Sequence, residues 1–152
     1  MATVGTSDAL SPHADVLREV LAEATSTNCI EIARVLLKLA VERRLPVPRT
    51  HQVAPLDLDK KTPLTRRERR AMRMVLPLRP EAKRRLGFAP DDFVRFPAWP
   101  YHVTTEFVAR TLVDCLTGEV GASIETYVET YFECSEYLGL IEFDVTQDQE
   151  PA

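Results

Sequence analysis

Four arginines near the middle of the chain are spaced so that one face of a helix could carry all of them. Arg66, Arg69, Arg70 and Arg73 follow the i, i+3, i+4, i+7 pattern of helical neighbours. Basic side chains clustered on one face release counterions when they neutralise phosphates, so the pattern indicates contact with nucleic acid or with an acidic protein. The candidate basic face consists of Arg66, Arg69, Arg70, Arg73, Lys83, Arg84 and Arg85.

The charge of the chain is divided between two segments of opposite sign. Residues 60–85 hold eleven basic and two acidic residues, a net charge of +9, although the whole chain carries −4. Residues 104–152 hold one basic residue and eleven acidic ones, a net charge of −10. The candidate acidic face consists of Glu125, Glu129, Glu133 and Glu136. Three interpretations stay open: solvated faces, mutual pairing within the chain or across a dimer, and contact with a partner.

The histidines and cysteines do not form a catalytic or metal-binding pattern in the sequence. His13, His51 and His102 are isolated, with no H-x₃-H or C-x₂-C spacing. Cys29, Cys115 and Cys134 are widely spaced, which is typical of reduced thiols, and we interpret Cys115 and Cys134 as core residues. We therefore expect a protein that is not an enzyme and holds no metal and no cofactor. One enzymatic hypothesis stays open, with a site around His102 and Asp91 or Asp92.

The elements that would position these residues are predicted to be helical from the first start signal onward. Ser11 and Pro12 begin a helix, residues 25–28 interrupt it, and a second helix is expected over 29–44. Thr65 and Glu68 form a capping box that begins the arginine-bearing helix. Pro80 begins a short helix that we expect to end at Gly87.

The C-terminal third is predicted to contain two further helices, over 104–117 and 124–138. A short strand after Gly139 would give this region, in outline, the order of the back half of a winged helix. The exposed side chains of the second helix are glutamates, which phosphate repels, so a partner-binding or dimerising version fits better than a DNA reader.

The sequence thus predicts a mainly α fold: a single compact helical domain of about six helices with at most a minor β element. Only 5 glycines against 11 prolines argue against a turn-rich β fold. The predicted divisions are a disordered N-terminus (1–10), a helical domain (11–144) and a disordered tail (145–152). Within the domain we expect a helical hairpin (11–44), a connector (45–64), basic helices (65–87), an aromatic and proline-rich extended segment (88–103) and an acidic helical pair (104–144).

The resulting functional hypothesis is a cytoplasmic interaction protein, such as an adaptor, an inhibitor or an assembly factor. It would act through its oppositely charged helical faces, on a protein partner or on a second copy of itself. The alternative is a nucleic-acid-associated transcriptional regulator that contacts phosphates through residues 60–85. No apolar run reaches the length of about 20 residues that a membrane span needs, so no membrane contact is expected.

Overall fold

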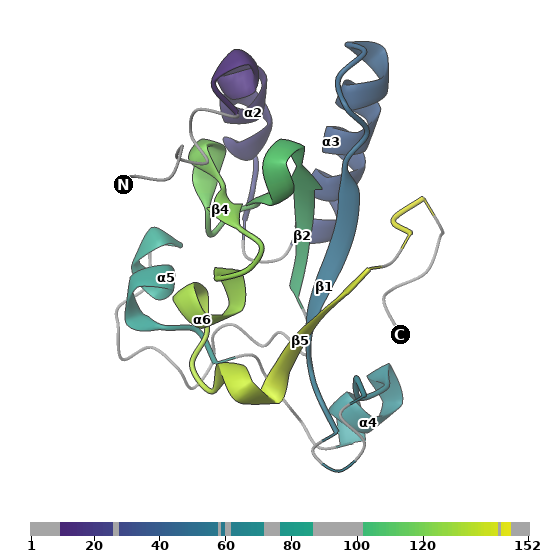
Figure 1. Ribbon diagram of the computed structural model, residues 1–152, viewed down its shortest axis with the longest axis vertical. Helices are drawn as coiled ribbons and strands as arrows, with labels where there is room; N and C mark the ends of the chain where they lie inside the picture. The colour runs from purple at the N-terminus through teal and green to yellow at the C-terminus, as the bar shows by residue number, and fades with distance from the viewer. Residues whose placement is uncertain are drawn as a thin grey trace.

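A five-stranded antiparallel sheet forms the centre of the protein in a computed structural model. The structure describes residues 10–25, 28–57, 59, 62–71, 77–86, 102–142 and 144–146. Helices cover both faces of the sheet (Figure 1). The prediction of a mainly α, six-helix domain is therefore wrong, and so is the description of the protein as helical.

The long strand β1 organises the sheet. The strands are β1 (Arg49–Pro55), β2 (His102–Phe107), β3 (Thr111–Val113), β4 (Ala122–Ser123) and β5 (Leu138–Glu142), in the order β4-β3-β2-β1-β5. Val53 in the middle of β1 lies opposite His102 of β2 on one side and Leu140 of β5 on the other. The segment 45–64, predicted to be a connector, thus supplies the strand to which two others pair.

The helices are short apart from the two near the N-terminus. They are η1 (Ser11–His13), α2 (Ala14–Leu21), α3 (Cys29–Glu42), α4 (Arg66–Ala71), α5 (Pro80–Arg85), η2 (Val108–Arg110), η3 (Gly118–Val120), α6 (Tyr127–Tyr131) and η4 (Ser135–Tyr137). The predicted start signals at Pro12 and Pro80 are confirmed. The capping box is also confirmed, because Glu68 N–H donates to Thr65 Oγ1 at 3.1 Å and Thr65 N–H donates to Glu68 Oε1 at 3.0 Å.

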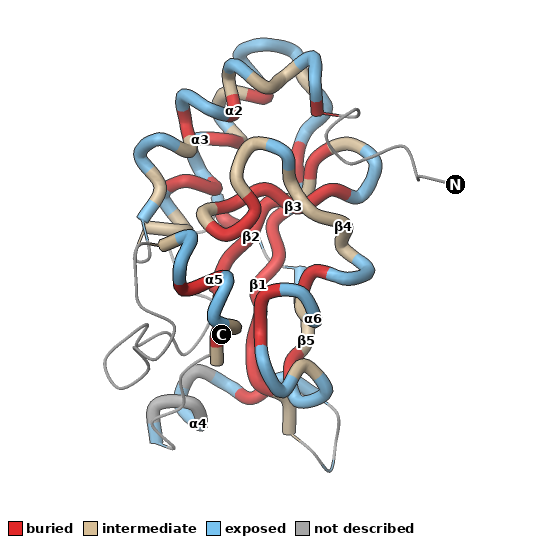
Figure 2. The backbone as a smooth tube through the Cα atoms, turned by 90° about the vertical axis from the view of Figure 1, so that its left-hand side faces the viewer, coloured by how far each residue is buried: buried red, intermediate tan, exposed pale blue. Residues whose placement is uncertain are grey.

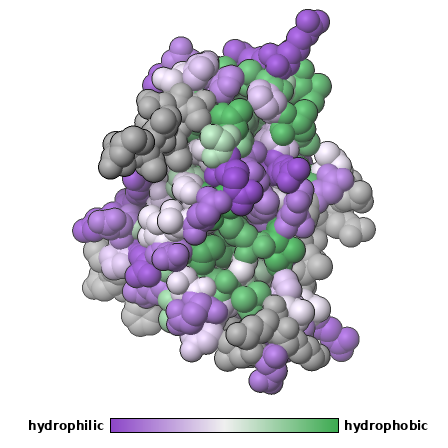
Figure 3. Space-filling view, in the orientation of Figure 1, coloured by the Kyte–Doolittle hydropathy of each residue, from purple (hydrophilic) through white to green (hydrophobic). Residues whose placement is uncertain are grey.

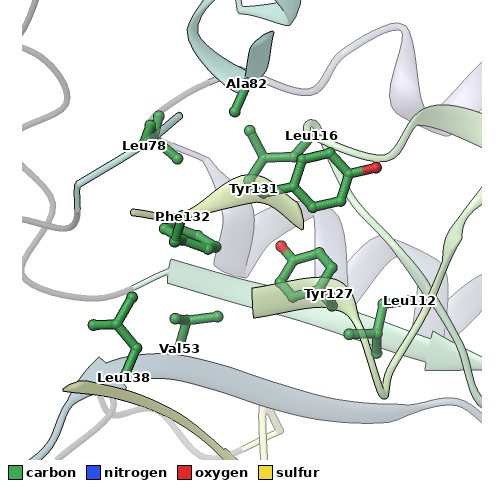
Figure 4. Packing of buried hydrophobic residues seen from close by; sticks show 9 residues of the cluster. All are labelled: Val53, Leu78, Ala82, Leu112, Leu116, Tyr127, Tyr131, Phe132 and Leu138. Carbon is green, nitrogen blue, oxygen red and sulfur yellow. The ribbon is translucent and has the colours of Figure 1, made fainter. Parts of the chain in front are cut away.

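The two faces of the sheet bury different groups of side chains. On one face Val53 and Leu112 pack with Tyr127 and Phe132, as Figure 4 shows. On the other face Phe107 and Val113 pack with residues of α2 and α3, namely Leu17, Val20, Ile32 and Leu36. Because both faces are covered, β1, β2 and β3 are buried along nearly their whole length (Figure 2). Burying this much apolar surface is the main stabilising contribution to the fold.

The prediction of a helix over 104–117 is wrong in type, and the prediction of a helix over 124–138 is wrong in length. The first region forms β2, a turn and β3, and the second is helical only over Tyr127–Tyr131 and Ser135–Tyr137. Consequently the winged-helix outline is wrong too. The strand predicted after Gly139 is confirmed as β5.

The turn between β2 and β3 replaces glycine with two residues in the left-handed conformation. Ala109 and Arg110 have φ angles of 56° and 55°. Phe107 pairs with Thr111, so the loop has the three residues Val108–Arg110. Positive φ angles in hairpin loops are usually supplied by glycine or asparagine. The shortage of glycine therefore did not exclude a β-hairpin here.

The ends of the described chain contribute to the core. Leu10 is 1% exposed and Val145 is 3% exposed, although the sequence placed disordered termini at 1–10 and from 145 onward. Val145 packs with Ala33 and Val103, and its carbonyl accepts a hydrogen bond from Arg34 Nε at 3.0 Å. The predicted aromatic segment lies outside the described residues as far as Tyr101. Among the residues that are described, none of the helices has the length and apolar character needed to cross a membrane.

Candidate active site

Three chain segments with chemically capable side chains meet at one end of the sheet. Since β2 and β3 are antiparallel, the beginning of β2 and the end of β3 lie together, which brings His102 close to Asp114. Helix α3 packs across β2, and its first residue is Cys29. The fold thus brings a thiol from early in the chain to an imidazole and a carboxylate that are 12 residues apart.

His102 and Asp114 form a buried pair. His102 Nε2 lies 3.0 Å from Asp114 Oδ2, with side-chain exposures of 0% and 5%. The ring of Phe132 lies beside the imidazole, with centroids 6.3 Å apart and planes tilted by 49°. This apolar cover keeps water from the pair, and an electrostatic interaction is stronger where water is excluded.

A tight loop after β3 holds the Asp114 carboxylate in place. Oδ1 accepts hydrogen bonds from the backbone N–H groups of Leu116 at 2.8 Å and Thr117 at 3.1 Å. The Thr117 hydroxyl in turn accepts a hydrogen bond from Asp114 N–H at 2.9 Å. Oδ2 accepts from His102 and from the hydroxyl of Tyr127. With four donors directed at it, the carboxylate is fixed in one orientation.

The buried pair shifts the proton affinity of both partners. Burial lowers the pKa of His102, but the hydrogen bond and the charge of Asp114, with a smaller contribution from Cys29, raise the pKa to about 9. Burial raises the pKa of Asp114, yet the charge and hydrogen bond of His102 outweigh it and the net shift is downward. At neutral pH the pair therefore consists of a carboxylate and an imidazolium.

Cys29 stands at the N-terminus of the 14-residue helix α3. The Asn28 side chain does not cap this helix: Oδ1 accepts from Thr25 N–H and Nδ2 donates to the Glu23 carbonyl, each at 2.7 Å. The first N–H groups of a helix have no partner inside it and attract negative charge.

The thiol of Cys29 interacts with the imidazole of His102. After Asp114, Cys29 makes a smaller contribution to the raised pKa of His102. The order thiol, imidazole, carboxylate is the arrangement of nucleophile, base and orienting group used in covalent acyl transfer.

A small hollow lies beside the thiol. Its volume is about 10 Å³, which leaves room for about one water molecule. The lining residues are Ala24, Thr25, Asn28, Cys29, Ile32, Val103, Thr105, Val113, Asp114 and Cys115. Cys29 is partly exposed, and so is Cys115, which lines the same hollow. Burial raises the pKa of the second thiol, Cys115, which makes it a poor nucleophile.

The structure does not assemble the predicted basic face into one surface. The side chains of Arg66, Arg69 and Arg70 on α4, and the whole of Arg73, lie outside the described residues. Figures 1 and 2 both place α4 at the lower end of the molecule, well below α5. On α5, Arg84 and Arg85 are exposed, but Lys83 is only 7% exposed. Lys83 is therefore not part of an open basic surface.

The four glutamates of the predicted acidic face are exposed but do not share one helical face. Only Glu129 belongs to α6, while Glu125 precedes it and both Glu133 and Glu136 follow it. Glu125 pairs with Arg110, with 2.7 Å between Oε1 and Nε. On the face drawn in Figure 3, hydrophilic side chains alternate with hydrophobic ones.

Parts of the basic and acidic segments nevertheless run side by side. Leu78 pairs with Phe132, and Arg79 N–H donates to the Tyr131 carbonyl at 2.9 Å. The Arg79 guanidinium also donates, through Nε, to the Glu129 carbonyl at 2.6 Å. Backbone pairing, rather than charge alone, joins the two segments.

Sequence reasoning found one member of this site and missed the others. His102 was the histidine of the enzymatic hypothesis, but its suggested partners Asp91 and Asp92 lie outside the described residues. Asp114 and Cys29 were missed. A signal for Cys29 was present, because a cysteine at the expected start of a helix stands where thiolates are stabilised.

Comparison with protein family models, curated proteins and solved structures found no match for the chain. Within the part of the chain that the structure describes, no group of three His, Cys, Asp or Glu side chains is arranged to hold a metal ion. The chemistry of the site is therefore argued from the thiol, the imidazole and the carboxylate themselves.

Proposed function

We propose that the protein is a thiol-dependent acyl-transfer enzyme that acts on an ester, thioester or amide. Cys29 is the nucleophile, His102 the general acid and base, and Asp114 the group that orients His102. The supporting observation is the buried imidazole of His102, which is hydrogen-bonded to Asp114 through Nε2. Cys29, at the start of α3, contributes to the raised pKa of this imidazole. This proposal replaces the non-enzymatic role expected from the sequence, which no observation tests.

In the first step the Cys29 thiolate attacks the carbonyl carbon of the substrate. A carbon–sulfur bond forms and the carbonyl oxygen takes the electron pair. The N–H groups of the first turn of α3, which have no partner inside the helix, would stabilise that oxyanion. His102 then gives its proton to the leaving oxygen, sulfur or nitrogen as the bond to it breaks, and an acyl-thioester of Cys29 remains.

The second step returns the enzyme to its starting state. His102, now neutral, accepts a proton from water or another acceptor nucleophile, which attacks the thioester carbonyl. The carbon–sulfur bond breaks, the acid or transferred product leaves, and Cys29 is again a thiolate beside an imidazolium. Throughout, the Asp114 carboxylate stabilises the charged imidazole without accepting a proton itself.

Alkylation by iodoacetamide tests the nucleophile without knowledge of the substrate. At pH 6, we expect Cys29 of the folded full-length protein to be carbamidomethylated at least tenfold faster than the exposed Cys134. Cys115, whose pKa burial raises, should react more slowly than Cys29. Intact mass and peptide mapping over time give the three rates. Equal rates for Cys29 and Cys134 would overturn the proposal.

Turnover of p-nitrophenyl acetate tests the acyl transfer itself. A burst of one p-nitrophenolate per Cys29, followed by slower release, is expected. Cys29→Ser should abolish the burst, His102→Gln should slow it at least a hundredfold, and Cys134→Ser should leave it unchanged. An unchanged burst in Cys29→Ser would show that another group reacts.

Partner binding through charged surfaces remains a second candidate function. Arg84 and Arg85 are exposed at the end of α5, and Glu133 and Glu136 are exposed near α6. Size exclusion at low and high salt, with a mobility-shift assay using nonspecific DNA, distinguishes self-association, protein binding and nucleic-acid binding. A monomer at all salt concentrations that shifts no DNA would contradict it.

A further inference from the structure

Tyr127 is a buried side chain whose hydroxyl the proposed reaction does not yet use. Its ring is fully buried among Leu112, Leu116, Tyr131 and Phe132 (Figure 4). An apolar ring of the same shape would satisfy that packing equally well. The hydroxyl, however, reaches out of α6 to Asp114, which belongs to the loop after β3. Packing therefore accounts for the ring of Tyr127 but not for its hydroxyl.

We propose that Tyr127 is a positioning residue, which acts on the reaction by fixing Asp114 Oδ2 against His102. The inference rests on the proposed function, since it assigns a role within the same site. Tyr127 and His102 donate to the same oxygen, while the backbone of Leu116 and Thr117 holds the other one. Tyr127 and the loop therefore both help to determine where the oxygen that meets His102 lies. A carboxylate held on both oxygens orients the imidazole better than one held on a single oxygen.

The hydroxyl also favours the charged form of the carboxylate. The hydrogen bond from Tyr127 contributes, after the charge and hydrogen bond of His102, to the lowered pKa of Asp114. The groups that act on Asp114 are His102 and Thr104 from β2 and Tyr127 from α6, while Cys29 from α3 acts on His102. Asp114 in turn contributes to the raised pKa values of Cys115 and Tyr131. Loss of the hydroxyl should therefore move the acid limb of the reaction to higher pH.

The variant Tyr127→Phe removes the hydroxyl and keeps the ring. We expect its Cys29 alkylation rate at pH 6 to fall roughly tenfold, the loss that one charge-assisted hydrogen bond causes. The acid limb of the rate profile should move upward in pH. Tyr131→Phe is the matched control, because Tyr131 lies in the same cluster with its ring 5.3 Å from that of Tyr127. It should alkylate at the wild-type rate.

A double-mutant cycle with Asp114→Asn shows whether Tyr127 acts through the carboxylate. In the Asp114→Asn protein, Tyr127→Phe should have no further effect on the rate. Equal additional loss in both backgrounds would overturn the role through Asp114. A wild-type rate and pH profile for Tyr127→Phe would overturn it as well, while leaving the fast, His102-dependent alkylation of Cys29 intact. Failure of that alkylation in the wild-type protein would instead overturn the proposed function.

If Tyr127→Phe does not fold, proton NMR of the wild-type protein answers the same question. A slowly exchanging Tyr127 hydroxyl proton with a cross-peak to the His102 ring supports the inference. A hydroxyl that exchanges at the rate of a solvated tyrosine overturns it.

Discussion

The two ends of the β2–β3 hairpin each carry an ion pair, and the pairs differ in burial far more than in distance. At the turn, Arg110 Nε lies 2.7 Å from Glu125 Oε1, and the two side chains are 64% and 59% exposed. At the open end, His102 Nε2 lies 3.0 Å from Asp114 Oδ2, and the exposures are 0% and 5%. The distances alone would rank the Arg110 pair first.

Burial reverses that ranking. An exposed ion pair loses hydration of its charged groups and gains a contact that water and salt screen. Its net contribution to the free energy of unfolding is therefore near zero. A buried pair has lost its hydration already, and each partner depends on the other to remain charged. Only the His102 pair can therefore shift a proton equilibrium strongly enough to serve chemistry.

Removing the imidazole from the buried pair should have the largest effect. We expect His102→Leu to lower the free energy of unfolding by about 3 kcal/mol, because the buried Asp114 carboxylate loses its charged partner. Urea denaturation followed by circular dichroism measures the change. A loss below about 1 kcal/mol would mean that the pair is far more hydrated than its exposure suggests.

The pH dependence of stability should follow the same pair. The folded-state pKa of His102, about 9, lies above its ordinary value of 6.5, so folding is favoured by proton binding. This contribution is complete below pH 6.5 and is lost as the pH rises toward 9. The free energy of unfolding should fall across that window by as much as ~3 kcal/mol. In His102→Leu this part of the fall should disappear, and a wild-type curve that is flat from pH 6.5 to 9 would contradict the assignment.

Breaking the exposed pair should have a much smaller effect. Arg110→Leu and Glu125→Gln should each unfold at a temperature close to that of the wild-type protein in 0.15 M salt. Differential scanning calorimetry makes the comparison. If either change destabilised the protein as much as His102→Leu, burial would not be what separates the two pairs.

Neutralising the exposed glutamates should have the smallest effect on the site. The triple variant Glu129→Gln, Glu133→Gln, Glu136→Gln removes three surface charges and no hydrogen bond to Cys29, His102 or Asp114. Alkylation of Cys29 should proceed at the wild-type rate at low and high salt. A salt-dependent change in that rate would show that the acidic surface acts on the thiol.

Local signals in the sequence predicted the helices well and the strands poorly. The starts of α2, α3 and α5 and the capping box of α4 depend on neighbouring residues, which the sequence displays. Most of β2 and all of β3 lie in the region 104–117 predicted to be a helix, because both faces of these strands are buried. A strand covered on both faces loses the alternation of apolar and polar residues that marks a half-exposed one. Their content of β-branched residues, Val103, Thr104, Thr105, Thr111 and Val113, was the remaining signal.

The site was hidden for a related reason. Cys29, His102 and Asp114 come together only through strand pairing and through the packing of α3 on β2. A sequence read as helices keeps these residues apart, and their spacing matches no short motif. Charged segments can be identified from the sequence alone. Which charged side chains are buried can be identified only from the fold.

The hairpin also determines how early the acid–base pair can form during folding. His102 and Asp114 are 12 residues apart, so closing the loop between them costs little chain entropy. Cys29 is far earlier in the chain and reaches them only when α3 docks. We therefore expect the imidazole–carboxylate pair to be a low-contact-order unit that assembles first, with the thiol added by a slower, long-range step. A folding intermediate between these two steps would have the His102–Asp114 pair formed, but Cys29 would not yet lie beside it.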